Sequence, residues 1–196
     1  MIDRARAAQA MEQFLRALGR SPEREPELAR TAELVTAAYA DELLIGYEMS
    51  AADILGGRLG AAGSEIVALR DIETSILCPH HLMPATGVVH VAYAPGQHVV
   101  GLGALARLVT CFARRLILQE TLVQSVADAL IEHLGARGAG CVAELSPTCL
   151  TTRGACCRAA RAVTSASAGN MRPGEALHAD YVELLLRPQP KRDGAA

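Results

Sequence analysis

The chain has 196 residues, is 51% hydrophobic and carries 19 basic and 21 acidic side chains, which gives a net charge of -2. These values suit one compact domain with a helical appendage, and the balanced charge provides no global attraction for nucleic acid or an anionic membrane. No apolar run reaches the ~20 residues of a membrane span, no signal peptide opens the chain, and only 3% of residues are aromatic. We therefore expect a cytoplasmic protein without a membrane element, in which the six cysteines are thiols or metal ligands rather than disulfides.

The first 64 residues are predicted to hold two helices and a connection. Apolar residues at helical spacing predict an amphipathic helix over residues 4–19 and a second helix from about Leu28 to Gly46. The glycine-rich residues 50–64 favour a flexible connection rather than a core element. This N-terminal region, residues 1–64, precedes the part of the chain with strand periodicity.

From Glu65 onward the hydrophobic period predicts two strands, then two helices separated by a break near Leu118, then two short strands. The expected elements cover residues 67–76, 88–93, 102–116, 122–130, 141–145 and 181–186. This order indicates an α+β class, with an antiparallel sheet backed by helices. We place the main domain at residues 65–188 and a frayed polar tail at residues 189–196.

The residues after the first predicted strand carry metal-binding chemistry. Cys78 is followed by His80 and His81 in SILCPHHLMP, and Cys149 in SPTCLTTRG is a candidate third ligand. One thiolate with His80 or His81 and a second thiolate suit zinc, and three protein ligands leave the fourth position for a catalytic water. The alternative is a structural cysteine with two surface histidines, because short motifs often match by chance.

The other cysteines are interpreted as structural. Cys111 lies on an apolar helix face and is expected in the core. Cys156 and Cys157 are adjacent and too close for an ordinary tetrahedral chelate, so we assign them to packing or to adventitious oxidation.

Four segments together resemble the signature segments of GTP cyclohydrolase I, the zinc enzyme that opens the imidazole ring of GTP. They read CPHHLMPATGVVHVAYAPGQHVVGLGALARLV, RRLILQETL, CLTTRG and VTSASAG, and the likeness spans about residues 66–186 in consistent order. The resemblance implies the tunnelling fold, in which an antiparallel four-stranded sheet is backed by two long helices and here follows an N-terminal helical extension. It also implies a ring-shaped homo-oligomer, a decamer being one candidate size, with active sites at subunit interfaces.

The same resemblance implies roles for individual residues. The zinc ligands would be Cys78, His81 and Cys149, and His80 would be the acid/base residue. Zn²⁺ is accordingly the expected cofactor, and a guanine-like small molecule is the expected substrate.

Substrate-binding residues also match by position. Glu120, preceded by Gln119, matches the carboxylate that pairs with the guanine edge, where one carboxylate accepts two N–H donors side by side. Arg107 and Arg153 match two phosphate-binding arginines. Without the resemblance, Glu120 would be read as a solvated helix residue and both arginines as ordinary surface residues.

Several positions depart from the family pattern. Pro79 replaces a glutamate, Pro147 replaces a histidine, Gly103 and Ala104 replace a Ser-Lys pair that holds the triphosphate, and Leu34 replaces an arginine supplied by a neighbouring subunit. Each charge-assisted bond to phosphate contributes about 1.5 to 3 kcal/mol, so losing a lysine and an arginine weakens triphosphate binding by several orders of magnitude.

We therefore predict a diverged zinc hydrolase in which zinc-bound water, assisted by His80, attacks C8 of a guanine-like ring held by Glu120. The substrate is expected to carry fewer phosphates than GTP, and the later closure to a pterin is doubtful because Pro147 replaces a second titratable group.

Three alternatives are kept. The first is an ordinary GTP cyclohydrolase I that makes 7,8-dihydroneopterin triphosphate and holds phosphate with Arg114, Arg115 or Arg158. The second is a ring-closing reaction on a diaminopyrimidine. The third is a non-catalytic, zinc-stabilised ring that binds a purine or a regulatory partner, against which the free imidazole of His80 argues, because a structural site has no use for it.

Overall fold

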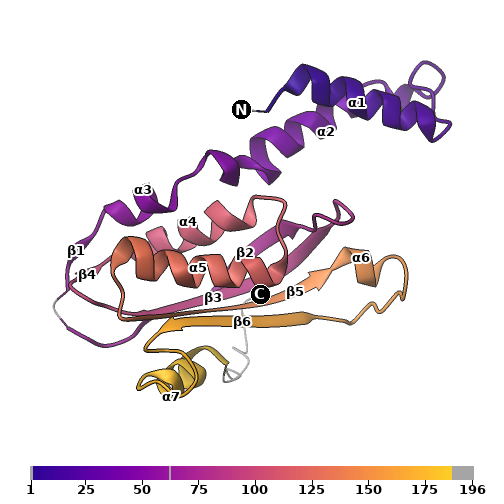
Figure 1. Ribbon diagram of the computed structural model, residues 1–196. Coiled ribbons are helices and arrows are strands. Elements are labelled where there is room, and N and C mark those ends of the chain that lie inside the picture. Colours follow the sequence, from indigo (N-terminus) through magenta and orange to yellow (C-terminus); the bar gives the residue numbers. More distant parts are fainter. Residues whose placement is uncertain (1, 62, 187–196) are drawn as a thin grey trace, which may run out of the picture.

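A four-stranded antiparallel sheet organises the protein in the computed structural model, which describes residues 2–61 and 63–186 (Figure 1). The tail predicted at residues 189–196 lies outside these residues. The sheet has the order β2-β3-β5-β6, with bounds Val67–Leu77, Pro84–Ala94, Gly138–Pro147 and Ala162–Gly169. The predicted α+β class is confirmed.

The strand register gathers three chain segments at one end of the sheet. Leu77 pairs with Pro84 across β2 and β3, and Ala85 pairs with Pro147 across β3 and β5. The end of β2, the start of β3 and the end of β5 are therefore neighbours. The metal-binding motif follows β2 directly, and Cys149 follows β5 after one intervening residue.

Two long helices cover one face of the sheet, α4 (Leu102–Ala113) and α5 (Gln119–Leu134) (Figure 1). The helix α5 packs mainly on β5 and β6, and α4 packs on β2. On the same face of the sheet, Val89, Val91 and Tyr93 of β3 are fully buried in the core that the helices cover. The predicted break near Leu118 is confirmed, because this residue is the N-cap of α5. Most of the apolar residues that predicted these two helices are buried in the structure.

The opposite face of the sheet is covered by a helical segment where the sequence predicted a strand. Residues 181–186 were predicted as a strand, but α7 (His178–Tyr181) and the π-helical η4 (Val182–Leu186) occupy this region. Tyr181 and Leu185, one helical turn apart, are buried against the sheet, and a Cβ atom at Gly140 would come within 2.0 Å of the Tyr181 ring. A short apolar run suits a strand or a buried helix equally well, and packing on the sheet decides for the helix.

The fourth strand is instead β6. Its sequence AVTSASAG alternates small and polar residues, so it lacks the bulky apolar residues that mark a buried strand. It was recognised in the sequence as a motif, not as a strand.

The N-terminal helices form a pair that projects away from the sheet in Figure 1. The first is α1 (Arg4–Ala17), close to its predicted extent. The second predicted helix is divided into four pieces, namely η1 (Pro26–Leu28), α2 (Thr31–Ala38), η2 (Tyr39–Leu43) and η3 (Ile45–Glu48). Its end passes closely over α4, since a Cβ atom at Gly46 would lie 2.4 Å from the carbonyl oxygen of Cys111.

The glycine-rich connection is more ordered than predicted. The helix α3 (Ala51–Gly56) begins at Ser50, whose hydroxyl accepts from the Asp53 N–H, and its Leu55 is fully buried among the core residues under α4 and α5. The following β1 (Leu59–Gly60) pairs with β4 (His98–Val99). The expectation that residues 50–64 contribute nothing to the core was therefore wrong.

Helices long and apolar enough to cross a bilayer do not occur in the part of the chain that the structure describes.

Candidate metal centre and active site

The loop between β2 and β3 has a defined shape. The Cys78 N–H donates to the Met83 carbonyl at 3.0 Å, the Leu82 N–H donates to the Cys78 carbonyl at 2.9 Å, and Leu82 adopts a left-handed backbone with φ of 52°. The Tyr39 hydroxyl, from the N-terminal region, donates to the Leu82 carbonyl at 3.2 Å. The loop is thus held both by its own backbone and by a residue far away in the sequence.

Cys149 is presented by the short helix α6 (Thr148–Thr151), which follows β5. The Thr148 hydroxyl donates to the Pro84 carbonyl at 2.6 Å, and this bond joins the start of α6 to the start of β3. Pro147 is both the last residue of β5 and the N-cap of α6. The helix therefore begins beside the loop that carries Cys78.

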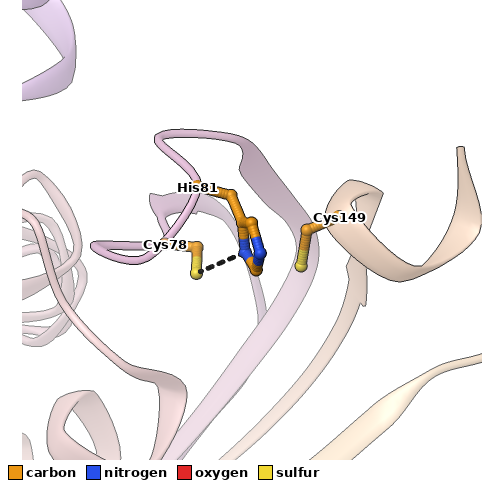
Figure 2. A group of neighbouring side chains, drawn as sticks. All are labelled: Cys78, His81 and Cys149. Carbon is orange, nitrogen blue, oxygen red and sulfur yellow. Dashed lines mark hydrogen bonds between the residues drawn. The ribbon is translucent and has the colours of Figure 1, made fainter. Parts of the chain in front are cut away.

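Cys78, His81 and Cys149 come together at this end of the sheet, as Figure 2 shows. Their ligand atoms all lie within 4.8 Å of one another, and the Cys78 Sγ is 3.8 Å from the His81 Nδ1. Tetrahedral zinc with bonds of about 2.0 to 2.3 Å requires ligand separations of roughly 3.3 to 3.8 Å. Two soft thiolates and one imidazole at this spacing fit zinc with only a small contraction.

His80 stands beside this triad without joining it. Its side chain is exposed, and its ring centroid is 6.3 Å from that of His81 at an interplanar angle of 88°. The two adjacent histidines lie in a turn rather than on a straight strand, so one imidazole faces the thiols and the other stays available. This resolves which of the two histidines groups with the cysteines.

The start of α5 lies at the same end of the sheet. Leu116 forms a parallel bridge with Leu77, and the Ile117 N–H donates to the Leu77 carbonyl at 3.1 Å. Glu120, in the first turn of α5, is exposed. Its carboxylate is therefore accessible to a small molecule at the end of the sheet where the loop between β2 and β3 lies.

Gln119 has a structural contact that the sequence did not reveal. Its side chain is only 8% exposed, and its Nε2 donates to the carbonyl oxygens of Ala143 and Ala162, both at 2.9 Å. The amide hydrogens thus attach the first turn of α5 to β5 and β6, and only the side-chain oxygen is left for a substrate.

The candidate phosphate-binding arginines differ in what they contact. Arg107 on α4 and Arg153 after α6 are exposed. Arg115 is occupied by the fold, because its Nε donates to the Gly46 and Cys111 carbonyl oxygens at 3.0 and 2.8 Å. Arg114 donates to the Ser75 hydroxyl at 2.9 Å.

The remaining cysteines divide into two groups. Cys111 and Cys141 are fully buried, which confirms the core position expected for Cys111, and burial raises the pKa of the Cys141 thiol. Cys156 and Cys157 are exposed, so packing was the wrong one of their two interpretations, and adventitious oxidation stays a prediction.

His90 is a buried polar residue that the strand pattern concealed. It is 2% exposed on β3, and its Nδ1 accepts from the Asp71 N–H at 3.0 Å. Asp71 lies in an irregularity of β2 and has φ of 57°. Desolvation, and then the nearby charge of Arg70, lower the His90 pKa, while Asp71 and Glu144 oppose this shift.

A Cys-His-Cys group that could hold a metal, with a second imidazole beside it at the end of an antiparallel sheet, is typical of a metalloenzyme site in an α+β protein. The profile of the GTP cyclohydrolase I family matches residues 7–186. A relative named GTP cyclohydrolase 1 from Bifidobacterium longum strain NCC 2705 is 42% identical over 179 residues, which cover 91% of this chain and 88% of the relative. The chain belongs to the GTP cyclohydrolase I family and is an enzyme of the cyclohydrolase type.

Further relatives agree. The GTP cyclohydrolase 1 of Campylobacter lari is 39% identical, with coverage of 90% of this chain and 93% of that protein. The one from Thermobifida fusca is 38% identical, with coverage of 94% and 89%. A crystal structure of the archaeosine synthase QueF-Like in the apo form, 16% identical, covers 56% of this chain and 97% of its own with a TM-score of 0.45, which is too low to carry an argument.

Proposed function

We propose that this protein is a zinc-dependent hydrolase that opens the imidazole ring of a guanine-like purine at C8. The observation that carries the proposal is the gathering of Cys78, His81 and Cys149 within 4.8 Å, with the exposed His80 beside them, in a chain of this family. Zinc bound by these three residues supplies a water ligand with a pKa near ~7 and hence a nucleophile at neutral pH.

The remaining roles belong to side chains of the protein. His80 is exposed and outside the triad, so its imidazole can take a proton from the attacking water and return one to the ring nitrogen that leaves C8. Glu120 can accept two N–H donors from the pyrimidine edge of the purine. Arg153, which follows α6, and Arg107, on α4, are proposed to bind phosphate; in a ring with sites at subunit interfaces, a neighbouring copy can supply Arg107.

Two versions of the substrate are supported by different observations. Ala104 and Leu34 have uncharged side chains, and Ala104 is also only 6% exposed. Neither position offers a charge to a triphosphate, which favours a substrate with fewer phosphates. The identity of 42% to a relative named GTP cyclohydrolase 1 favours the ordinary reaction of GTP to 7,8-dihydroneopterin triphosphate.

Self-association is part of the proposal. Within the described sheet, β2 and β6 are the two edges, so each has one side open for pairing with another copy. The projecting N-terminal helices also expose Phe14 by 56% and Leu18 by 59%. Open edges and exposed apolar side chains support a ring of copies in the tunnelling-fold manner.

The deciding experiment is a mass-resolved activity screen of the zinc-loaded protein against GTP, GMP, guanosine, guanine and a diaminopyrimidine. A formamide product from a purine supports ring opening, and a dihydropterin triphosphate from GTP selects the ordinary enzyme. Turnover of the diaminopyrimidine alone selects ring closure.

The non-catalytic alternative is tested with His80→Ala. If His80 moves protons, the variant keeps its zinc and loses on the order of 10²- to 10⁴-fold in kcat. His133→Ala, at the far end of α5, is the matched control. An inactive wild-type protein that binds guanine equally well with and without His80 would be a binding ring rather than an enzyme.

A further inference from the structure

The segment that follows the metal ligand Cys149 is locally basic. Residues 145–174 contain Arg153, Arg158, Arg161 and Arg172 and no aspartate or glutamate, although the whole chain has a net charge of -2. No acidic residue of this stretch can neutralise these guanidinium groups. Within this stretch, Arg153 and Arg158 follow closely after Cys149, whereas Arg172 lies beyond the far end of β6.

The loop after α6 folds back on the helix. Gly154 and Cys156 both have left-handed backbones, with φ of 58° and 50°, and only Gly adopts this conformation without steric cost. The Cys156 N–H donates to the Arg153 carbonyl, and the Cys157 N–H donates to the Leu150 carbonyl, both at 3.1 Å. This double reversal returns the chain to α6, where Arg158 comes to lie beside its last turn.

A hollow of about 430 Å³ results, lined by Thr151, Thr152, Cys156 and Arg158. Arg158 is exposed, and among the described residues no side chain or backbone group forms an ion pair or hydrogen bond with it. The Thr152 hydroxyl donates to the Thr148 carbonyl at 2.7 Å, which fixes its oxygen in place. Because the single Thr152 O–H is already donated, the hollow offers an available guanidinium and one further donor, the Thr151 hydroxyl.

We infer that this hollow binds a phosphate group of the substrate, with Arg158 as its main ligand. The inference rests on the proposed function and adds a residue that does not match the family motif. A guanidinium can form two parallel hydrogen bonds to phosphate oxygens, and the Thr151 hydroxyl can donate a third. Thr152 is the C-cap of α6, the short helix that also carries Cys149, so the hollow and the third residue of the triad are built on the same helix.

Arg158 can replace part of the positive charge that is missing at the family's own phosphate-binding positions. Gly103 and Ala104 lie on α4 and offer no charge, whereas Arg158 lies on the same chain segment as the metal ligand. Arg115, an alternative source of charge, is bound to backbone carbonyls. Arg158 is the better substitute because no contact within the described chain competes for its guanidinium.

The test compares Arg158→Ala, Arg158→Lys and the control Arg172→Ala. Arg172 belongs to the same acid-free stretch but follows the opposite end of β6. Binding of inorganic triphosphate to the zinc-loaded proteins is measured by calorimetry at equal zinc content. We expect the dissociation constant to rise about 10- to 100-fold in Arg158→Ala, to recover partly in Arg158→Lys and to stay unchanged in Arg172→Ala.

A second measurement uses turnover. The KM of a phosphorylated purine should rise in Arg158→Ala by a similar factor, while the KM of the corresponding nucleoside and both kcat values stay constant. Equal triphosphate binding by Arg158→Ala and Arg172→Ala overturns the inference, even if purines are hydrolysed. Arg158-dependent triphosphate binding without turnover of any purine upholds the subsite and overturns the proposed function.

Discussion

At the scale of single residues, the metal centre depends on side chains from two distant parts of the chain. Cys78 and His81 occupy one loop, and Cys149 comes from α6, so loss of Cys149 leaves a two-residue fragment of the triad. Two ligands hold zinc poorly because the remaining positions are filled by water. We therefore expect metal retention to require the thiolate of Cys149.

We expect Cys149→Ser to lower zinc affinity by on the order of 100-fold or more, beyond the effect typical of outer-shell changes. Zinc per chain, measured by elemental analysis after dialysis, should fall close to zero. Cys157→Ser removes an exposed thiol from the same segment and should retain zinc. A full equivalent of zinc in Cys149→Ser would rule out this residue as a ligand.

His90 is the residue for which the structure predicts a pH effect. Its Nδ1 accepts a hydrogen bond from the Asp71 N–H, which requires an unprotonated nitrogen, and burial lowers its pKa. As the pH falls through the ordinary histidine pKa, His90 becomes protonated in the unfolded chain while it stays neutral in the folded protein. The free energy of unfolding contributed by His90 is therefore present at neutral pH and is lost on acidification.

We expect the free energy of unfolding to fall between pH 7.5 and pH 5, with a smaller fall in His90→Gln. Urea titrations at several pH values give the measurement, and His133→Gln serves as the control. The charged groups that face His90 are Arg70, Asp71 and Glu144, and all three are kept in every variant. An identical pH slope in the wild type and His90→Gln would contradict the assignment.

At the scale of elements, the loop between β2 and β3, which carries Cys78 and His81, is supported from outside the sheet. The Tyr39 hydroxyl, at the start of η2, donates to the carbonyl of Leu82, which is the left-handed residue of the loop. This bond connects the N-terminal region to the residues next to His81. Removing the hydroxyl should loosen the loop without touching a ligand.

Tyr39→Phe is expected to weaken zinc binding by about 2- to 10-fold, the effect of one ordinary hydrogen bond. Competition with a chromophoric chelator provides the affinity. Tyr47→Phe is the matched control, since its hydroxyl accepts from the Leu116 N–H, outside the loop. Equal zinc affinities for the two variants would show that the loop holds its shape without Tyr39.

The helix α3 provides the second prediction for an element. Because Leu55 is fully buried, Leu55→Ala should lower the free energy of unfolding by about 2 to 5 kcal/mol. Leu59→Ala, in the same glycine-rich segment but 67% exposed, should change it by less than about 0.5 kcal/mol. Chemical denaturation measures both free energies of unfolding. Equally small changes in the two variants would show that residues 50–64 connect other elements without stabilising the core.

At the scale of the whole molecule, the described sheet has two edge strands at which copies of the chain could associate. Both of its edge strands, β2 and β6, can pair with a further strand, and Val163 on β6 is 60% exposed. We expect light scattering to give a mass several times that of the 20.6 kDa chain. The double change Phe14→Ser and Leu18→Ser should yield smaller assemblies if the N-terminal helices join copies. A mass of one chain at micromolar concentration would contradict the ring.

Much of this architecture could be predicted from the sequence because the signals are local. The helical spacing of apolar residues located α4 and α5, and the apolar run along β3 located a strand, whose second half the structure buries on both faces. Cysteine and histidine spacing pointed to a metal. Each of these patterns depends on residues within one element.

Other features depended on contacts between distant segments, so the tertiary structure alone decided them. Tyr181 and Leu185 became helical because they pack on the sheet, where Gly140 leaves room for the aromatic ring. Cys149 reaches Cys78 and His81 because β5 ends beside the start of β3; the family resemblance had implied this set of residues, but residue spacing alone left His80 and His81 both open. Burial and orientation come from partners remote in the chain, and local periodicity carries no record of those partners.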